Sequence, residues 1–333
     1  MIKINYNQLN KVLILRIGRI GDIIISSFVF RVLKETNPEI KIELITLKKN
    51  KDVLRCNPFL DKIYFVNKNV FSLLKILPLY FKNYDLIIDL NDNPSTTSSI
   101  LLAITRAQHK LGFDFKKQKR FLTIPVAYPG KDKMHLIDRY AYLLSSSGLE
   151  LNPEQIKLEL YLDPEINNSI NQQFSKIREH SKIISINISA SADIRKYPAT
   201  KWIELIQSLK TRFPFFKYLI LYDSADKYEA NSIINSIDKQ FLIFSEGTSF
   251  QHFAAKIKNS DLLITPDTSA VHIASAFQVP VIALYPNVDW NFISFAPYKT
   301  KFRAIKSSSE EIISISVSEI EKALESLIQE LNW

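Results

Sequence analysis

Side chains able to take part in chemistry gather in short segments that directly follow apolar runs. The richest segment spans residues 266–269, with the sequence Pro-Asp-Thr-Ser, and precedes a small-residue stretch, 270–277, that carries His272. We expect a strand, a polar turn and a helix here, so that unpaired N–H groups and the helix dipole favour an anion. A helix N-cap alone accounts for Asp267 or Thr268, and His272 alone fits a half-buried structural residue. Taken together, the segment favours a ligand-binding site.

An earlier segment, from Arg16 to Asp22, reads Arg-Ile-Gly-Arg-Ile-Gly-Asp and follows an apolar run. Its two glycines are three residues apart, which does not match the dinucleotide-binding fingerprint G-x-G-x-x-G. The loop instead presents Asp22 at the start of a helix, where the dipole stabilises an ionised carboxylate. Such a group can accept a proton from an attacking hydroxyl. The alternative is a residue that only stabilises the first turn of the helix.

The third segment extends from Asn187 to Pro198 and follows another apolar run. The hydroxyls of Ser189 and Ser191 can donate to phosphate oxygens. Arg195 and Lys196 add positive charge, and arginine can bind a phosphate through two hydrogen bonds. A solvated basic pair at the surface is the alternative interpretation.

Two acids and an amide, Asp89, Asn91 and Asp92, lie at the end of the apolar run 84–90 and just beyond it. Such groups at a strand end can hold a divalent cation. The same residue types also cap strands and open loops, and we favour that role. We therefore expect no metal site.

Composition limits the class of protein. The 333 residues are long enough for two domains, since one core rarely exceeds about 250–300 residues. No uncharged apolar run reaches the roughly 18–20 residues that span a bilayer, and the first residues lack a signal-peptide core. We expect a cytoplasmic protein. Cys56 is the single cysteine, so neither an intramolecular disulfide nor a cysteine metal cluster is expected.

Positive charge is concentrated in the first half of the chain. Residues 1–150 carry 24 Lys and Arg against 13 Asp and Glu, whereas residues 151–333 carry 19 against 21. The first half therefore suits an anionic partner. Zinc-finger spacing and aromatic ribonucleoprotein motifs are absent from the sequence, so nucleic acid is not expected. We assign the acceptor side of the site to five basic residues: Arg19, Lys116, Lys117, Lys119 and Arg120.

Apolar runs and helical patterns alternate twice along the chain, which is typical of two α/β domains with parallel sheets. We place one domain over 1–155 and the other over 156–316, followed by a terminal helix within 317–333. Ligands in such folds lie at the carboxyl ends of the strands. The predicted strands are 11–17, 42–47, 62–66, 84–90, 110–113, 121–124, 182–188, 261–265 and 280–285, and the predicted helices are 22–35, 70–81, 96–106, 134–147, 164–180, 270–277 and 317–331.

The segments, in this order, resemble those of the ADP-heptose:lipopolysaccharide heptosyltransferases, glycosyltransferase family 9. Gly21-Asp22 matches the family's Gly-Asp, which implies that Asp22 is the catalytic base. Residues 195–198 match a Lys-x-Trp-Pro stretch, which implies that Arg195, or alternatively Lys196, binds the donor diphosphate. Residues 267–272, including Thr268 and Ser269, match a box that lines the nucleotide-sugar site. Departures such as Ser269 in place of glycine leave the donor sugar open.

The resemblance implies the GT-B fold, an α/β architecture of two Rossmann-like domains facing across a cleft, with the final helix packing back on the first domain. It further implies an inverting, metal-independent transfer of heptose or a related sugar from an ADP-sugar to lipopolysaccharide core or another glycan. No cofactor beyond the donor substrate is expected. The partners would be the nucleotide-sugar and an anionic glycolipid at the inner-membrane surface. Alternatives are another nucleotide sugar, a non-catalytic glycan-binding relative or, less expected, a nucleotide-dependent oxidoreductase.

Overall fold

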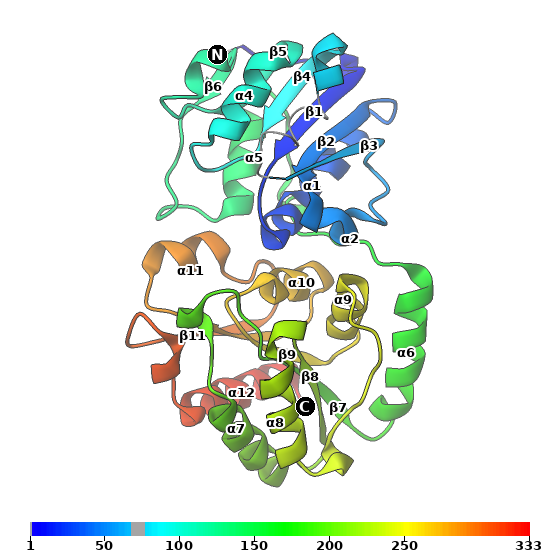
Figure 1. The fold of residues 1–333 in the computed structure, drawn as a ribbon, viewed down its shortest axis with the longest axis vertical. Coiled ribbons are helices and arrows are strands. Elements are labelled where there is room, and N and C mark those ends of the chain that lie inside the picture. The colour runs from blue at the N-terminus through cyan, green and yellow to red at the C-terminus, as the bar shows by residue number, and fades with distance from the viewer. Residues whose placement is uncertain (1, 68–76) are drawn as a thin grey trace. The chain divides into compact units, whose positions relative to one another are not determined.

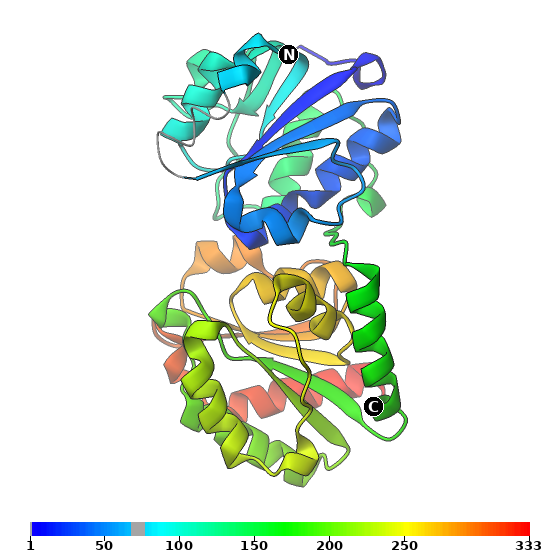
Figure 2. The same cartoon turned by 45° about the vertical axis from the view of Figure 1, so that its right-hand side comes forward.

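The computed structural model describes residues 2–67 and 77–333, which fold into two compact units, 1–161 and 162–333 (Figures 1 and 2). Each unit is a parallel sheet with helices packed against it, as the alternating pattern predicted. The division between the units lies six residues beyond the predicted boundary at 155/156.

The first unit contains a parallel sheet with the strand order β3-β2-β1-β4-β5-β6. The central strand β1 pairs with β2 on one side and β4 on the other, with Val12 opposite Ile42 and Leu86. These strands are almost continuously apolar because helices cover the sheet and bury both faces. The elements are β1 (Lys11–Arg16), α1 (Ile20–Thr36), β2 (Lys41–Leu47), α2 (Lys51–Leu54), β3 (Lys62–Val66), β4 (Asn83–Asp89), α4 (Thr96–Ile104), β5 (Arg106–Phe113), β6 (Ile124–Val126) and α5 (Leu136–Ser146).

The second unit contains a parallel sheet with the strand order β11-β10-β9-β7-β8. Its core includes the fully buried Trp202 and Leu205 of α7, packed among apolar strand residues such as Ile184 and Ile264. The elements are α6 (Pro164–Arg178), β7 (Lys182–Asn187), α7 (Ala199–Arg212), β8 (Phe216–Leu221), α8 (Lys227–Ser236), α9 (Phe250–Lys258), β9 (Leu262–Pro266), α10 (Ser269–Phe277), β10 (Val281–Tyr285), α11 (Asp289–Phe295), β11 (Phe302–Lys306) and α12 (Val317–Leu331).

Both sheets reverse their strand order at one place, which is where such folds open a crevice for ligands. In the first unit the reversal lies between β1 and β4, so the loop before Asp22 and the segment Asp89–Asp92 leave neighbouring strand ends. In the second unit it lies between β7 and β9, so the segments beginning at Asn187 and Asp267 are neighbours in the same way. The topology thus brings each pair of polar segments together.

The final helix, α12, belongs to the second unit. The side chains of Ile320, Leu324 and Leu327 on α12 are fully buried in the core of the second unit, together with Trp202 and Leu205. The apolar face of the helix is therefore buried in the core of the second unit.

Three predictions need revision. The predicted strand 121–124 is replaced by a 3-10 turn, Lys119–Phe121, and a short strand, β6, that starts at Ile124. Helix α4 ends at Ile104 because the chain enters strand β5 at Arg106. Most of the predicted helix 70–81 lies outside the described residues, and its described end, Leu77–Phe81, is a 3-10 helix.

Candidate functional site

Asp22 lies in the first turn of α1, at the carboxyl end of β1. Its Oδ2 atom accepts a hydrogen bond of 2.6 Å from the backbone N–H of Arg19. Its Oδ1 atom lies 3.0 Å from Nη2 of Arg16, and the side chain keeps 20% of its surface exposed. The helix-stabilising role predicted as the alternative is therefore present. The partial exposure still leaves the carboxylate accessible for a proton.

Gly18 permits the close packing of this loop. A Cβ atom built on Gly18 would lie 2.5 Å from Oδ2 and 2.9 Å from Cβ of Asp22. The carbonyl of Gly18 accepts a hydrogen bond of 3.1 Å from the buried Asn50, which also donates to Thr46. The first glycine of the segment is thus required by contact with Asp22.

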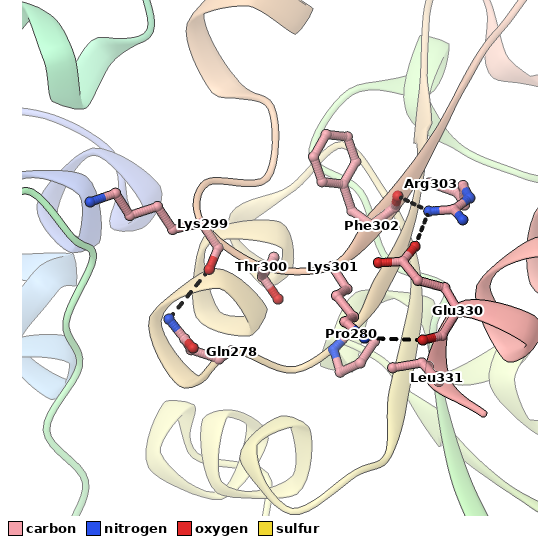
Figure 3. Close-up of a pocket in the computed structure, with 9 residues that line it drawn as sticks. All are labelled: Gln278, Pro280, Lys299, Thr300, Lys301, Phe302, Arg303, Glu330 and Leu331. Atoms are coloured by element: carbon pink, nitrogen blue, oxygen red, sulfur yellow. Dashed lines mark hydrogen bonds and ion pairs between the residues drawn. The ribbon is translucent and has the colours of Figure 1, made fainter. Parts of the chain in front are cut away.

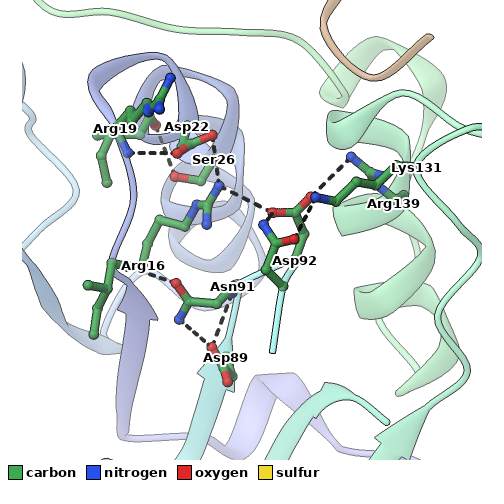
Figure 4. Close-up of polar contacts among 12 residues, drawn as sticks. Arg16, Arg19, Asp22, Ser26, Asp89, Asn91, Asp92, Lys131 and Arg139 are labelled. Carbon is green, nitrogen blue, oxygen red and sulfur yellow. Dashed lines mark hydrogen bonds and ion pairs between the residues drawn. The ribbon is translucent and has the colours of Figure 1, made fainter. Parts of the chain in front are cut away.

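Arg16 is the main electrostatic partner of Asp22, and its side chain is only 4% exposed. Nη2 of Arg16 also lies 3.9 Å from Asp92, which in turn lies 3.2 Å from Nη2 of Arg139 (Figure 4). Burial acts to lower the pKa of Arg16, but Asp22, Tyr140, Asp92 and Asp89 raise it above its ordinary value. Arg16 therefore carries its positive charge where it faces Asp22.

Asp89 and Asn91, considered above as metal ligands, form hydrogen bonds within the protein. Asp89 accepts from Asn91 at 2.6 Å and from Gln118 at 3.0 Å, and also from Ser98. Oδ1 of Asn91 accepts from the backbone N–H of Ile17 at 3.0 Å, which ties β4 to the loop that carries Asp22. Burial raises the pKa of Asp89 even though Ser98, Asn91 and Arg16 act to lower it. This arrangement matches the loop-forming role that the sequence favoured.

The predicted acceptor-side residues are exposed. Lys116, Lys117, Lys119 and Arg120 follow β5, and Arg19 precedes α1, so all emerge beyond the carboxyl ends of strands in the first unit. Gln118, inside this basic run, is almost fully buried and links the run to Asp89.

In the second unit, Asp267 and Arg195 come together at the junction of β7 and β9. Nη1 of Arg195 lies 3.3 Å from Oδ2 of Asp267 and donates to its backbone carbonyl at 3.1 Å. The Asp267 carboxylate is buried and also accepts from Nδ2 of Asn291 at 2.5 Å. Thr268 is the N-cap of α10 and accepts from the N–H of Ala270 at 3.3 Å. The arginine, the acid and a helix N-terminus therefore share one place.

The other predicted donor-site residues of this segment, Ser189, Ser191 and Lys196, have different surroundings from Arg195. Ser189 accepts from the N–H of Asp223 at 2.8 Å, whereas Ser191 is exposed. Lys196 is exposed and lies 3.6 Å from Asp226, so it is not paired with Asp267 as Arg195 is. The two neighbouring basic residues therefore have different acidic partners.

Two predicted residues belong to α10 itself. Ser269 is its first residue, and His272 lies within the first turn. His272 is buried rather than half-buried, with its ring centroid 6.1 Å from that of Phe295.

Sequence reasoning missed several polar residues around both sites. Asn187, at the end of β7, donates to Thr265 at 2.9 Å and Thr268 at 3.2 Å, and Asn291 holds Asp267. A polar residue that ends an apolar strand, such as Arg16 or Asn187, was the available signal. The sequence contains no such signal for Asn291 or Arg139, because their contacts with the two sites join residues that are far apart in the chain.

A separate hollow of about 600 Å³ lies on the second unit at the amino ends of β10 and β11 (Figure 3). Pro280, Phe302 and Leu331 line it together with basic residues such as Lys301 and Arg303. Arg303 is held by Glu330 at 2.8 Å. This hollow is at the opposite ends of the strands from Asp267 and is not part of the candidate site.

Comparison with known proteins decides the family. The model of glycosyltransferase family 9 (heptosyltransferase) matches residues 76–324. The chain belongs to glycosyltransferase family 9. It is therefore a glycosyltransferase, as predicted, and the segments that suggested the family lie at the two strand-order reversals.

Curated relatives of this family 9 chain are distant in sequence but match it over most of both lengths. Lipopolysaccharide heptosyltransferase 1 of Campylobacter coli is 24% identical in an alignment of 295 positions that covers 83% of each chain. Putative lipopolysaccharide heptosyltransferase 4 of Escherichia coli is 25% identical, over 81% of this chain and 72% of the relative.

Solved structures share the fold over almost the full length. A family 9 glycosyl transferase from Veillonella parvula superimposes with a TM-score of 0.83 at 18% identity, covering 98% of this chain and 99% of the other. ADP-heptose LPS heptosyltransferase II of E. coli gives a TM-score of 0.75 at 17% identity, covering 97% and 100%. The predicted α/β class with two parallel-sheet units is confirmed. Among the helices of residues 2–67 and 77–333, none has the length and apolar character needed to cross a bilayer.

Proposed function

We propose that this family 9 enzyme transfers a heptose or related sugar from an ADP-sugar to a lipopolysaccharide-type glycan acceptor. The observation that carries the proposal is the partly exposed Asp22 carboxylate, which Arg19 and Arg16 hold at the strand-order reversal of the first unit. Similar proteins include heptosyltransferases named for lipopolysaccharide and an E. coli heptosyltransferase solved with ADP-2-deoxy-2-fluoro heptose.

The proposed reaction is a single displacement with inversion at the anomeric carbon. Asp22 removes the proton from an acceptor hydroxyl, and the oxygen forms a new bond to the anomeric carbon. The bond from that carbon to the donor phosphate breaks at the same time, and its electron pair leaves with the nucleoside diphosphate. Asp22 retains the proton until solvent removes it.

The leaving diphosphate requires positive charge and N–H donors. We assign these to Arg195 and to the N-terminus of α10, whose first residues follow Thr268. Removing one positioned donor of this kind commonly costs about 3–4 kcal/mol of transition-state stabilisation. Arg195 is preferred to Lys196 because it is paired with Asp267, whereas Lys196 lies beside Asp226. With arginine in this role, we propose that transfer needs no divalent metal.

The acceptor is proposed to be an anionic glycolipid at the cytoplasmic face of the inner membrane. The exposed basic run, with Lys116 and Lys117, and the net charge of +9 support this, since each basic residue near an acidic surface contributes about 1 kcal/mol. Arg19 lies three residues before Asp22 and is exposed, so we assign it the contact with the acceptor near the reacting hydroxyl.

The decisive experiment compares wild type with Asp22→Asn, which keeps the size of the side chain and removes its basicity. We expect donor binding, measured by titration with ADP-heptose, to be unchanged and turnover to fall at least 100-fold, since general base catalysis contributes about 10²–10⁴-fold. Transfer by wild type should continue in EDTA. Transfer by Asp22→Asn at the wild-type rate would exclude this carboxylate as the base.

A panel of other nucleotide sugars serves as the control for the donor. If transfer from a UDP- or GDP-sugar is faster than from ADP-heptose, the proposed mechanism stands but the proposed donor is wrong.

A further inference from the structure

A row of alternating buried charges leads from Asp22 into the first unit. Arg16 lies 3.0 Å from Asp22 and 3.9 Å from Asp92, and Asp92 lies 3.2 Å from Arg139 (Figure 4). The exposed fractions of the Arg16, Asp92 and Arg139 side chains are 4%, 5% and 0%. Only Asp22, at the end of the row, reaches solvent to an appreciable extent.

Stability alone does not explain this arrangement. Burying charged groups has a large desolvation cost, and well-packed apolar residues often replace buried ion pairs with no loss of stability. A buried charge pair does fix the position of each partner, because any displacement leaves an uncompensated charge in a medium of low dielectric constant. The row is therefore better suited to hold a side chain in place than to stabilise the fold.

The geometry at Asp22 fits this role. Its two oxygens are restrained from different directions: Oδ2 by the N–H of Arg19 and Oδ1 by the guanidinium of Arg16. With both oxygens held, rotation of the carboxylate about its terminal bond is blocked. Arg16 is itself restrained, because its guanidinium also packs over the ring of Tyr140, with 5.7 Å from Cζ to the ring centroid.

The far end of the row is anchored to a loop. Nη1 of Arg139 donates to the hydroxyl of Tyr128 at 3.1 Å and to the carbonyl of Gly130 at 3.3 Å. This loop follows β6 and contains Lys131, which donates to Asn93, the residue after Asp92. The charge row therefore connects Asp22 with the loop after β6.

We propose that Arg16 is a positioning residue for Asp22, and that Asp92 and Arg139 hold Arg16 in place. This inference rests on the proposed function, in which Asp22 is the base. Arg16 contacts no substrate in this proposal. It acts by keeping the Asp22 carboxylate in one orientation while the acceptor hydroxyl approaches.

The test uses Arg16→Met, Arg16→Lys and the double variant Arg16→Met with Asp22→Asn, all assayed for sugar transfer over a range of donor concentrations. A misplacement of about 1 Å can cost roughly 10²-fold in rate, so Arg16→Met should lower kcat by on the order of 10–100-fold with the KM for donor unchanged. Arg16→Lys, which retains the charge, should recover part of that loss. In the Asp22→Asn background, Arg16→Met should lower the residual rate less than twofold.

Arg31→Met is the matched control. Arg31 is a largely buried arginine on α1, paired with Glu159 inside the same unit and exposed by 11%. Its loss should lower the free energy of unfolding, measured with urea, as Arg16→Met does, while kcat per folded enzyme is retained.

The outcomes separate this inference from the proposed function. If Asp22→Asn abolishes transfer but Arg16→Met behaves like Arg31→Met, Arg16 is structural and the positioning role is wrong. Equal fold-losses from Arg16→Met with and without Asp22 would also overturn it. If Asp22→Asn transfers sugar normally, the proposed function fails first. Should Arg16→Met not fold, Arg16→Lys decides the question: a kcat between those of wild type and Asp22→Asn supports the positioning role, and a wild-type kcat contradicts it.

Discussion

Adding one methyl group at Gly18 should displace the proposed base with little effect on the fold. The new Cβ atom would lie 2.5 Å from Oδ2 of Asp22, whereas ordinary contact begins near 3.4 Å, so the carboxylate must move by about 0.9 Å. A shift of that size costs roughly 10²-fold in rate when reacting groups must be aligned. The 2.9 Å contact with Cβ of Asp22 prevents relief by rotation of the carboxylate alone.

The effect on stability should be small by comparison. Gly18 is not among the glycines with positive φ, so alanine is compatible with its backbone and also restricts the unfolded chain. We expect Gly18→Ala to lower the free energy of unfolding by about 1–2 kcal/mol, measured by urea denaturation, because moving Asp22 weakens its hydrogen bond to Arg19 at the start of α1 and its ion pair with Arg16. Turnover with ADP-heptose and acceptor should fall by on the order of 100-fold, with donor binding unchanged.

Gly247→Ala is the contrasting variant. Gly247 has a φ of +87°, and a Cβ there would lie 2.0 Å from the ring of His252, so its replacement should destabilise the second unit. A Gly18→Ala enzyme with wild-type turnover would refute the claim that this loop fixes Asp22 for catalysis. A Gly18→Ala protein that unfolds as readily as Gly247→Ala would refute the stability argument.

Two further predictions concern pH and the membrane. Burial disfavours the charged form of Glu43, but hydrogen bonds from Tyr84, Lys82 and Tyr64 outweigh it and lower its pKa from 4.5 to about 2. The resulting stability, up to about 3 kcal/mol, is present above pH 4.5 and lost as the pH falls towards 2. Glu43→Gln should therefore weaken the pH dependence of the free energy of unfolding over that range, measured with urea. An unchanged pH dependence would contradict this. Binding to vesicles of acidic lipid should weaken with salt and with Lys117→Glu, and equal binding to neutral vesicles in high salt would argue against a membrane-surface acceptor.

Local patterns were sufficient for much of the fold. The apolar run at Lys62–Val66 and the amphipathic helix Val317–Leu331 have the predicted bounds, since each pattern has the period of its own element. Short irregular stretches were predicted less well. The run 121–124 is apolar enough for a strand, but the pairing of Thr123 with Lys110 fixes the strand only from Ile124 onwards.

The packing partner of the final helix could not be read from its sequence. An amphipathic helix shows that one face is buried and not which core buries it. The second unit supplies that core through side chains such as Trp202 and Leu205, which are more than 100 residues away in sequence.

The sequence by itself determined the element types and the segments that carry Asp22, Arg195 and Asp267, because strand periodicity and polar residues at strand ends are local properties. Only the tertiary structure decided which charges face one another. Arg195 pairs with Asp267 across 72 residues, whereas Lys196, its neighbour in the chain, pairs with Asp226. Strand order sets these pairings, since parallel strands that are far apart in the chain deliver their carboxyl ends to the same place.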